Sequence, residues 1–356
     1  MLQVITDRDR RGAQVFALDL QQGLRRLGND VGTVALAPGR HGDLLALETL
    51  GASQHSWRTL RALRSRARHY DIVIAHGSST LFACSLALAF TGVPFIYRQI
   101  SDPLFWAATW PRRLRVAAMI RRAAAIVALS EGVSAVLRIH YWLGSGRITV
   151  IPNAVPIGNF HAASVHEREL ARQRFDLPVE GPVVAYVGAL AQEKGVDHVV
   201  RCAGSIPHVH ALIVGDGPER ARLELLAAET APGRVHFTGS IEGSLEAFMA
   251  ADLVVLPSKG GDSMPAVLIE AGLCGLATVV TPVGAIADVV IDGETGSVVP
   301  VNDLARFTAA VGDLVDDATG RNVLGSAAAA RCKDLFTIDA TAPRWNALIT
   351  SIARQT

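Results

Sequence analysis

The chain has 356 residues, half of them hydrophobic, and a formal net charge of +1. This composition excludes an intrinsically disordered chain, and the length leaves room for two domains that each bury a core. The four cysteines lie scattered in apolar segments without paired spacing. The sequence therefore predicts neither a disulfide framework nor a cysteine metal site.

Hydropathy gives no sign of an integral membrane protein. A start of five largely apolar residues precedes the first charges, and no apolar run approaches the roughly 20 residues that a membrane-spanning helix needs. We therefore expect a cytoplasmic protein whose membrane contact is at most peripheral, on the inner face of the membrane.

The near-zero net charge hides an asymmetry between the two halves of the chain. Before Pro178 there are 22 arginines, no lysine and 12 acidic residues, whereas the remainder holds 12 basic and 21 acidic residues. The halves thus carry about +10 and −9. Two domains with different partners would explain this, the basic one facing something anionic, and solvated arginine faces explain it equally well. We expect no nucleic-acid partner.

Short apolar runs rich in valine and isoleucine alternate with longer helical patterns along the whole chain. Predicted strands in the first half are 2–6, 31–36, 71–75, 94–98, 125–129 and 147–151, with helices at 13–27, 57–69, 81–90, 112–123 and 132–142. Strands resume at 183–187, 209–214, 234–237, 252–257, 278–281 and 297–299. Continuous apolar strands between helices are typical of parallel sheets covered on both faces. About a dozen strands are too many for one ordinary open sheet, so we expect an α/β protein with two doubly wound sheets.

The break between the two sheets falls at 152–182, where four prolines interrupt the apolar periodicity. We place a linker at 156–181, carrying one exposed charged helix, between domains 1–155 and 182–337. The final segment, 338–356, has Trp345, Leu348 and Ile352 at helical spacing and is expected to dock as an amphipathic helix on the first domain.

Small residues and charges follow several predicted strands, where parallel sheets bind ligands. The run GALAQEK at 188–194 places Gly188 and Lys194 between a strand and a helix, and if this loop stood alone a surface lysine would be the favoured explanation. In the first half, Arg11 and Gly12 follow the first strand and His76 follows the third.

The stretch 252–282 reads as a strand, a loop with Asp262, a helix with one carboxylate, Glu270, and a second strand. A carboxylate on a buried helix can accept two hydrogen bonds from a vicinal diol such as a ribose. The loop carboxylate and the main chain before and in the first helical turn can meet sugar hydroxyls and a diphosphate. The main-chain residues concerned are Ser263, Met264, Pro265, Ala266 and Val267, of which Pro265 lacks an N–H. A structural pair with an arginine is the alternative for Glu270, and a helix N-cap is the alternative for Asp262.

These motifs together resemble a family 4 glycosyltransferase of the GT-B fold. The likeness rests on VGALAQEKGVD at 187–197, VGDGPE at 214–219, VHFTG at 235–239, ADLVVLPS at 251–258, the run DSMPAVLIEAGLCGLATVVTPVGAIADVV at 262–290, GETGSVVP at 293–300 and IPNAV at 151–155. It extends over nearly the whole chain and is strongest over 182–305.

The resemblance implies a retaining transferase that moves a sugar from a nucleotide-diphosphate donor, bound mainly by the second domain, to a hydroxyl acceptor. It implies no cofactor and no metal, so that Lys194 and helix N-termini balance the diphosphate. By position Glu270 would bind the nucleotide ribose, Asp262 would lie near the donor sugar, and Gly12 would approach the phosphates.

Three departures from the family pattern affect the donor site. Asp262 is one methylene shorter than the usual glutamate, and Ala189 replaces an arginine that commonly assists Lys194. Losing that charge-assisted partner is expected to weaken donor binding by about 1.5–3 kcal/mol unless Arg98 or Arg11 replaces it. Ile100 stands where many relatives carry a histidine, which leaves Arg98, Gln99 and Asp102, and less readily His76, as polar candidates for the sugar or acceptor site.

The proposed chemistry is front-face displacement, in which the leaving diphosphate oxygen accepts the proton of the acceptor hydroxyl. The acceptor itself is unknown; tryptophans and arginines in 104–123 and the basic first half are compatible with an anionic or lipid-linked acceptor or with membrane contact. A loop followed by a basic surface helix explains 104–123 equally well. Two other readings stay open: a catalytically weakened nucleotide-sugar-binding partner and a GT-B nucleotide-sugar epimerase.

Overall fold

The structure, a computed structural model, describes residues 1–39, 44–100, 109–158 and 160–354. The chain divides into two compact units, the first made of 1–156 and 336–356 and the second of 157–335. Each unit holds one sheet whose strands all pair in parallel, so the predicted pair of doubly wound sheets is confirmed.

The first sheet has seven strands in the order β3-β2-β1-β4-β5-β6-β7. They are β1 Leu2–Ile5, β2 Gly32–Ala35, β3 Glu48–Thr49, β4 Val73–His76, β5 Phe95–Arg98, β6 Ala125–Ala128 and β7 Ile148–Val150. The covering helices are α1 Gly12–Arg26, α2 Trp57–Ala67, α3 Ser78–Ala87, α5 Trp110–Ile120 and α6 Glu131–Tyr141. Strand β3 was not predicted, because its two residues pair only with β2 at the edge of the sheet and bury no apolar side chain.

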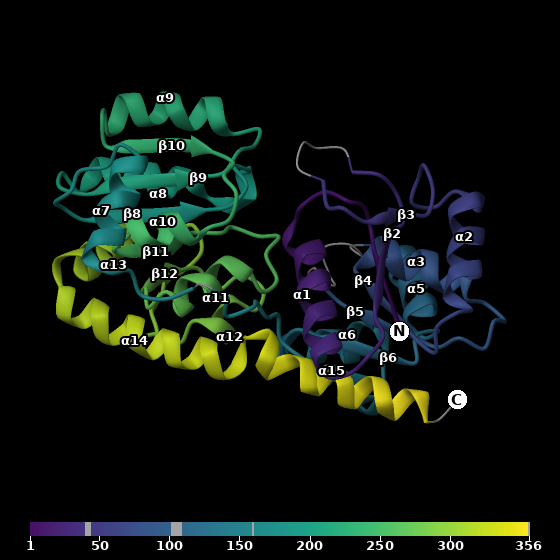
Figure 1. Cartoon of the computed structure of the whole chain (residues 1–356). Coiled ribbons are helices and arrows are strands. Elements are labelled where there is room, and N and C mark those ends of the chain that lie inside the picture. Colours follow the sequence, from purple (N-terminus) through teal and green to yellow (C-terminus); the bar gives the residue numbers. More distant parts are fainter. Residues whose placement is uncertain (40–43, 101–108, 159, 355–356) are drawn as a thin grey trace. The chain divides into compact units, whose positions relative to one another are not determined.

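The last helix, α15 Ile338–Ala353, packs against α1 in the first unit (Figure 1). Trp345 is fully buried there, and Gly23 on α1 is needed because a Cβ atom would lie 2.5 Å from the Ile338 side chain. Arg26 on α1 and Asp339 on α15 form an ion pair at 2.6 Å. The chain therefore returns to the first unit to complete its core.

The second sheet has six strands in the order β10-β9-β8-β11-β12-β13. They are β8 Val183–Val187, β9 His210–Val214, β10 Val235–Gly239, β11 Leu253–Leu256, β12 Thr278–Val280 and β13 Ser297–Val298. Its helices are α7 Val165–Arg174, α8 Val196–Ser205, α9 Arg220–Thr230, α10 Leu245–Ala250, α11 Ala266–Leu273, α12 Ile286–Val289, α13 Leu304–Asp316 and α14 Ala318–Leu335.

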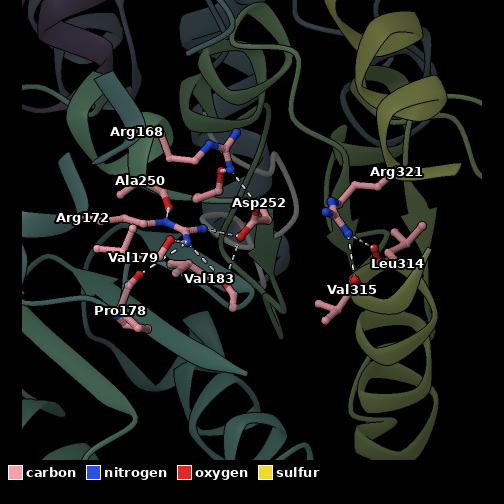
Figure 2. A network of polar contacts seen from close by, with 12 residues as sticks. Arg168, Arg172, Pro178, Val179, Val183, Ala250, Asp252, Leu314, Val315 and Arg321 are labelled. Carbon is pink, nitrogen blue, oxygen red and sulfur yellow. Dashed lines mark hydrogen bonds and ion pairs between the residues drawn. The ribbon is translucent and has the colours of Figure 1, made fainter. Parts of the chain in front are cut away.

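Residues 157–181, assigned to a linker from the sequence, are grouped with the second unit. The charged helix expected there is α7, and it is only partly exposed. Arg172 is buried, donates to four main-chain carbonyls and reaches Asp252 at 2.6 Å (Figure 2). This arginine attaches α7 to the start of β11, a contact that a polar sequence pattern does not reveal.

None of the helices in the described part of the chain is both long enough and apolar enough to span a bilayer.

Candidate active site

Two loops of the second unit leave the carboxyl edge of the sheet from neighbouring strands. From β8 the chain continues to β9 and β10 on one side, whereas β11, β12 and β13 lie on the other. The loops after β8 and β11 therefore flank the point where the strand order reverses, and ligands of doubly wound sheets bind in the crevice at such a point.

Main-chain contacts hold these two loops together. The carbonyl of Glu193 accepts hydrogen bonds from the amides of Lys259 at 2.7 Å and Gly260 at 3.3 Å. Gly195 has a left-handed φ of +65°, and a Cβ atom there would lie 2.2 Å from the Pro257 carbonyl oxygen. Only glycine fits such a close approach, so the glycine after Lys194 fixes the spacing of the loops.

Charged side chains also cross between the loops. Lys194 forms an ion pair with Asp262, whose second oxygen accepts a hydrogen bond from Ser258. Lys259 reaches Asp197 at 2.8 Å. Lys194 and Asp262, which the family resemblance places at the diphosphate and near the donor sugar and which we predict to be the catalytic pair of residues, are thus brought into direct contact. Sequence reasoning placed both in loops but did not pair them, because they are 68 positions apart.

Helix α11 begins beside this ion pair. Its N-cap is Pro265, and across the described chain no side chain caps it. Asp262 therefore does not act as the helix N-cap, which removes the alternative interpretation of that residue. The first amides of the helix lie next to Ser263 and Met264, with Met264 buried and Ser263, Ala266 and Val267 partly accessible. An uncapped helix N-terminus favours an anion.

Glu270 is the fifth residue of α11 and is mostly buried. Its Oε2 accepts a hydrogen bond of 2.5 Å from the Ser244 hydroxyl, at the start of α10. Burial raises the pKa of Glu270, while the Ser244 hydrogen bond lowers it. No arginine or lysine pairs with this carboxylate among the described side chains. The alternative of a structural ion pair is therefore absent, and Ser244 is a neighbour that no sequence spacing indicated.

The loop after β12 supports the Asp262 loop from the other side. Gly284 has φ +60°, and a Cβ atom there would lie 2.2 Å from the Asp262 carbonyl oxygen. The Ala285 amide donates to the Ser263 carbonyl at 2.5 Å. The main chain ahead of α11 is therefore fixed by its neighbour.

Gly188 lies directly after β8, under the Tyr186 side chain. A Cβ atom at Gly188 would lie 2.8 Å from the Tyr186 hydroxyl oxygen, and this hydroxyl donates to the Ala189 carbonyl at 2.8 Å. Burial raises the pKa of Tyr186, so the hydroxyl keeps its proton for this bond. Ala189, where the family pattern has arginine, is exposed.

In the first unit, Arg11 and Gly12 lie at the start of α1. Arg11 is held by both oxygens of Asp7, at 2.5 and 2.6 Å, so its charge is compensated within the unit. A Cβ atom at Gly12 would meet nothing within 4 Å in the described structure. Packing inside this unit therefore does not account for a glycine here.

Arg98 and His76 lie inside the first unit. Arg98 is 1% exposed, lies 3.6 Å from the centre of the Phe16 ring and donates to Asn153 at 2.8 Å. Burial lowers the pKa of Arg98 to about 9. The His76 Nε2 lies 2.8 Å from the Gln3 Oε1, which can only accept, so Nε2 carries the proton.

Gln99 accepts a hydrogen bond from the Tyr97 hydroxyl at 2.8 Å and is itself buried. Asp102 lies outside the described residues, as do residues 104–108 of the aromatic and arginine-rich segment. The assignment of these first-unit residues to a sugar or acceptor site therefore stays a prediction.

Within the described residues, no cluster of three or more histidine, cysteine, aspartate or glutamate side chains could hold a metal ion.

Family models match both units. The model of Glycosyltransferase Family 4 matches residues 10–159, and that of Glycosyl transferases group 1 matches residues 167–331. Among characterised relatives, the alpha-maltose-1-phosphate synthase of Mycolicibacterium smegmatis is 28% identical over 91% of both chains. The 2-deoxystreptamine glucosyltransferase of Streptomyces kanamyceticus is 32% identical over 56% of this chain. That match spans about half (53%) of the length of the relative.

Solved structures share the fold over the full length. HepE of Anabaena, in complex with UDP and glucose, superimposes with a TM-score of 0.86 at 19% identity, covering 98% of this chain and 99% of HepE. Sucrose-phosphate synthase of Thermosynechococcus elongatus gives a TM-score of 0.84 at 21% identity, covering 100% and 99%. The two parallel-sheet units thus form a GT-B fold, and the chain belongs to the family 4 glycosyltransferases, enzymes that transfer glycosyl groups.

Proposed function

We propose that this enzyme transfers a sugar from a nucleotide-diphosphate donor to a hydroxyl acceptor, with retention of the anomeric configuration and without a metal. The proposal rests on one observation: Lys194, the uncapped start of α11 and Glu270 all lie at the carboxyl edge of the second sheet, next to the point where its strand order reverses. HepE of Anabaena was crystallised with UDP-glucose, which makes UDP-glucose the first donor to test.

The diphosphate would bind at the N-terminus of α11. Lys194 supplies one positive charge, and the first helix amides supply hydrogen bonds directed at the anion. Because Lys194 is paired with Asp262 before a donor binds, the donor phosphate has to share or replace that partner. The short Asp262 side chain then stays beside the sugar, held by Ser258.

The nucleotide ribose would bind at Glu270. The carboxylate has one oxygen on the Ser244 hydroxyl, and its remaining acceptor positions suit the two hydroxyls of a ribose. A mostly buried carboxylate without a cationic partner is costly to keep ionised, and ribose hydrogen bonds would offset part of that cost.

Transfer would proceed by front-face displacement. The acceptor oxygen forms a bond to the anomeric carbon on the face from which the diphosphate leaves. The bond between that carbon and the phosphate oxygen breaks, and the same phosphate oxygen takes the hydroxyl proton. Lys194 and the α11 amides stabilise the charge that develops on the leaving group. Gly12 would allow close approach of the first unit's main chain to the phosphates.

The test is donor turnover by the purified full chain with a panel of nucleotide sugars, with and without EDTA. We expect transfer or slow donor hydrolysis that EDTA does not abolish, and a product of retained configuration. Inversion would overturn the retaining mechanism. Binding without any turnover would favour a nucleotide-sugar-binding partner, and conversion of the donor to its epimer would favour an epimerase.

We also propose that an aromatic and basic surface of the first unit is part of the acceptor site. Trp110 on α5 and Trp142 at the end of α6 are 60% and 49% exposed, and their rings meet edge to face at 5.6 Å. Ile139 nearby in sequence is 68% exposed, and arginines flank Trp110 at positions 112, 113 and 115. Exposed tryptophans beside arginines suit an anionic membrane surface that presents a lipid-linked acceptor.

Liposome flotation tests this surface. Wild-type protein is expected to float with vesicles of phosphatidylglycerol and not with pure phosphatidylcholine, and added salt should weaken the binding. Trp110→Ser together with Trp142→Ser should abolish flotation. The exposed Trp57→Ser, on α2, is the matched control. Equal recovery of all variants in the floated fraction would contradict the assignment.

A further inference from the structure

A small cavity lies in the second unit at the end of the sheet opposite the candidate active site. Its volume is about 210 Å³, and it is bordered by α7, the start of β11, the end of α11 and the start of α14. The polar side chains on its wall are Arg168, Asp252, Arg321 and Asn322. Asp252 directly precedes β11, whereas Ser258 and Asp262 follow it. A strand of four residues rises about 13 Å, so the cavity and the candidate active site are separate.

The single carboxylate on this wall is already satisfied. Asp252 Oδ1 accepts from Arg168 at 2.6 Å, and Oδ2 accepts from Arg172 at 2.6 Å and from the Val183 amide at 2.8 Å (Figure 2). One negative charge is therefore shared by two guanidinium groups. Arg172, the buried one, also donates to main-chain carbonyls and is a structural residue.

The two arginines on the wall keep unused donors. Arg168 bonds through Nη1 alone, to Asp252 and to the Ala251 carbonyl. Arg321 likewise uses only Nη1, for the carbonyls of Leu314 at 2.6 Å and Val315 at 2.9 Å (Figure 2). A guanidinium has five N–H donors, so Nε and Nη2 of both arginines have no partner among the described residues. Arg321 forms no ion pair with a carboxylate in the described part of the second unit.

We propose that this cavity is an anion-binding site that takes a phosphate group, as inorganic phosphate or as a small phosphomonoester. Two guanidinium groups with free N–H edges and the Asn322 amide match the several acceptor oxygens of a phosphate, and the wall carries excess positive charge. The volume far exceeds the roughly 10–15 Å³ that a single water needs. This assignment does not depend on the proposed glycosyl transfer.

Titration calorimetry of the full chain at constant ionic strength tests the site, with inorganic phosphate and glycerol 3-phosphate as probes. Arg321→Gln is expected to weaken phosphate binding at least tenfold. Arg331→Gln is the matched control: Arg331 is on the same helix and also donates to two carbonyls, those of Val289 and Asp288, but does not line the cavity. It should change the affinity less than twofold.

Two further variants keep the test decisive. Asn322→Asp preserves the size of the side chain and removes no hydrogen bond that the described structure contains, but it places a negative charge on the cavity wall. It should therefore weaken phosphate binding at least tenfold, as expected for Arg321→Gln, and it provides the test if Arg321→Gln does not fold. Lys194→Ala should leave phosphate binding at the cavity unchanged. Loss of binding in Lys194→Ala would move the phosphate to the active-site loops and overturn the proposal, as would equal affinities of Arg321→Gln and Arg331→Gln. Binding of inorganic phosphate alone would limit the site to the free ion, and binding of both probes would extend it to phosphomonoesters.

Discussion

The carboxyl edges of the two sheets differ in how they hold charged residues. In the second unit, Lys194 and Asp262 pair across two loops and keep 20% and 11% of their side-chain surface accessible. In the first unit, Arg98 occupies the end of β5 but is buried against Phe16 and Asn153. Charged residues at or beyond the carboxyl ends of parallel strands are thus partly accessible in one case and buried in the other. The packing and the partners of each side chain determine how accessible its charge is, and the position of the residue in the sequence does not reveal this.

The largest expected effect is a loss of stability in the first unit that leaves the second unit unchanged. Trp345→Ala removes a fully buried side chain from the contact of α15 with α1 and should lower the free energy of unfolding of the first unit by about 3–5 kcal/mol. Denaturant unfolding followed by circular dichroism measures the loss. Trp345→Phe is the control and should lose clearly less. At temperatures where both units are folded, Trp345→Ala should bind the nucleotide as tightly as the wild type. A large drop in affinity would mean that nucleotide binding by the second unit depends on the packing of α15 in the first.

The next effect concerns the diphosphate. Lys194→Ala should reduce kcat/KM by about 10²–10³-fold, since the leaving group loses a charge aligned in the transition state. Lys259→Ala is the matched control, because Lys259 lies in the adjoining loop and pairs with Asp197 instead. It should cost less than tenfold. If the two variants lost activity equally, the effect of Lys194 would come from holding the loops and not from the donor.

A smaller effect is a pH dependence of nucleotide binding. Burial raises the pKa of Glu270 above the usual 4.5, so the carboxylate that would hold the ribose takes up its proton at a higher pH than an ordinary glutamate. Affinity for the nucleoside diphosphate should therefore fall as the pH drops through this raised value. Glu270→Gln should bind more weakly at neutral pH and lose that dependence. A wild-type affinity that stays flat down to pH 4.5 would argue against ribose binding by Glu270.

The smallest effect is in the first unit. Burial, assisted by the charge of Arg98, lowers the pKa of His76 well below 6.5, so the folded state keeps this histidine neutral while the unfolded chain protonates it. Stability contributed by neutral His76 is present above pH 6.5 and is lost as the pH falls below it, at up to about 1.4 kcal/mol per pH unit. His76→Gln should flatten the stability curve of the first unit between pH 6.5 and 5. An unchanged slope would show that other groups control the acid sensitivity.

The strand and helix pattern could be predicted because the inner strands of both sheets are mostly short apolar runs, as in VVAYV at 183–187. The edge strand β3 could not, because its two residues pair with a single neighbour and bury no apolar side chain. The attachment of α7 to the start of β11 could not be predicted either, since it depends on Arg172, the buried one of the three arginines on this helix. A charged sequence pattern does not reveal which of its members is buried.

For the candidate site, the sequence identified the loops and the carboxylate on α11 but not their partners. The pair of Lys194 with Asp262 and the bond of Ser244 to Glu270 join residues 68 and 26 positions apart. Such contacts depend on the order of the strands, and the sequence pattern specifies strands without their order. The sequence also did not reveal that Arg98 is buried, and its assignment to a sugar or acceptor site stays a prediction.

The most direct test is a crystal structure of the full chain with the nucleoside diphosphate that stabilises it most in a thermal-shift screen. We predict that the diphosphate lies within hydrogen-bonding distance of the Lys194 ammonium and the first amides of α11, with the ribose hydroxyls on Glu270. A nucleotide bound elsewhere, with the Lys194–Asp262 pair and Glu270 left uncontacted, would contradict it.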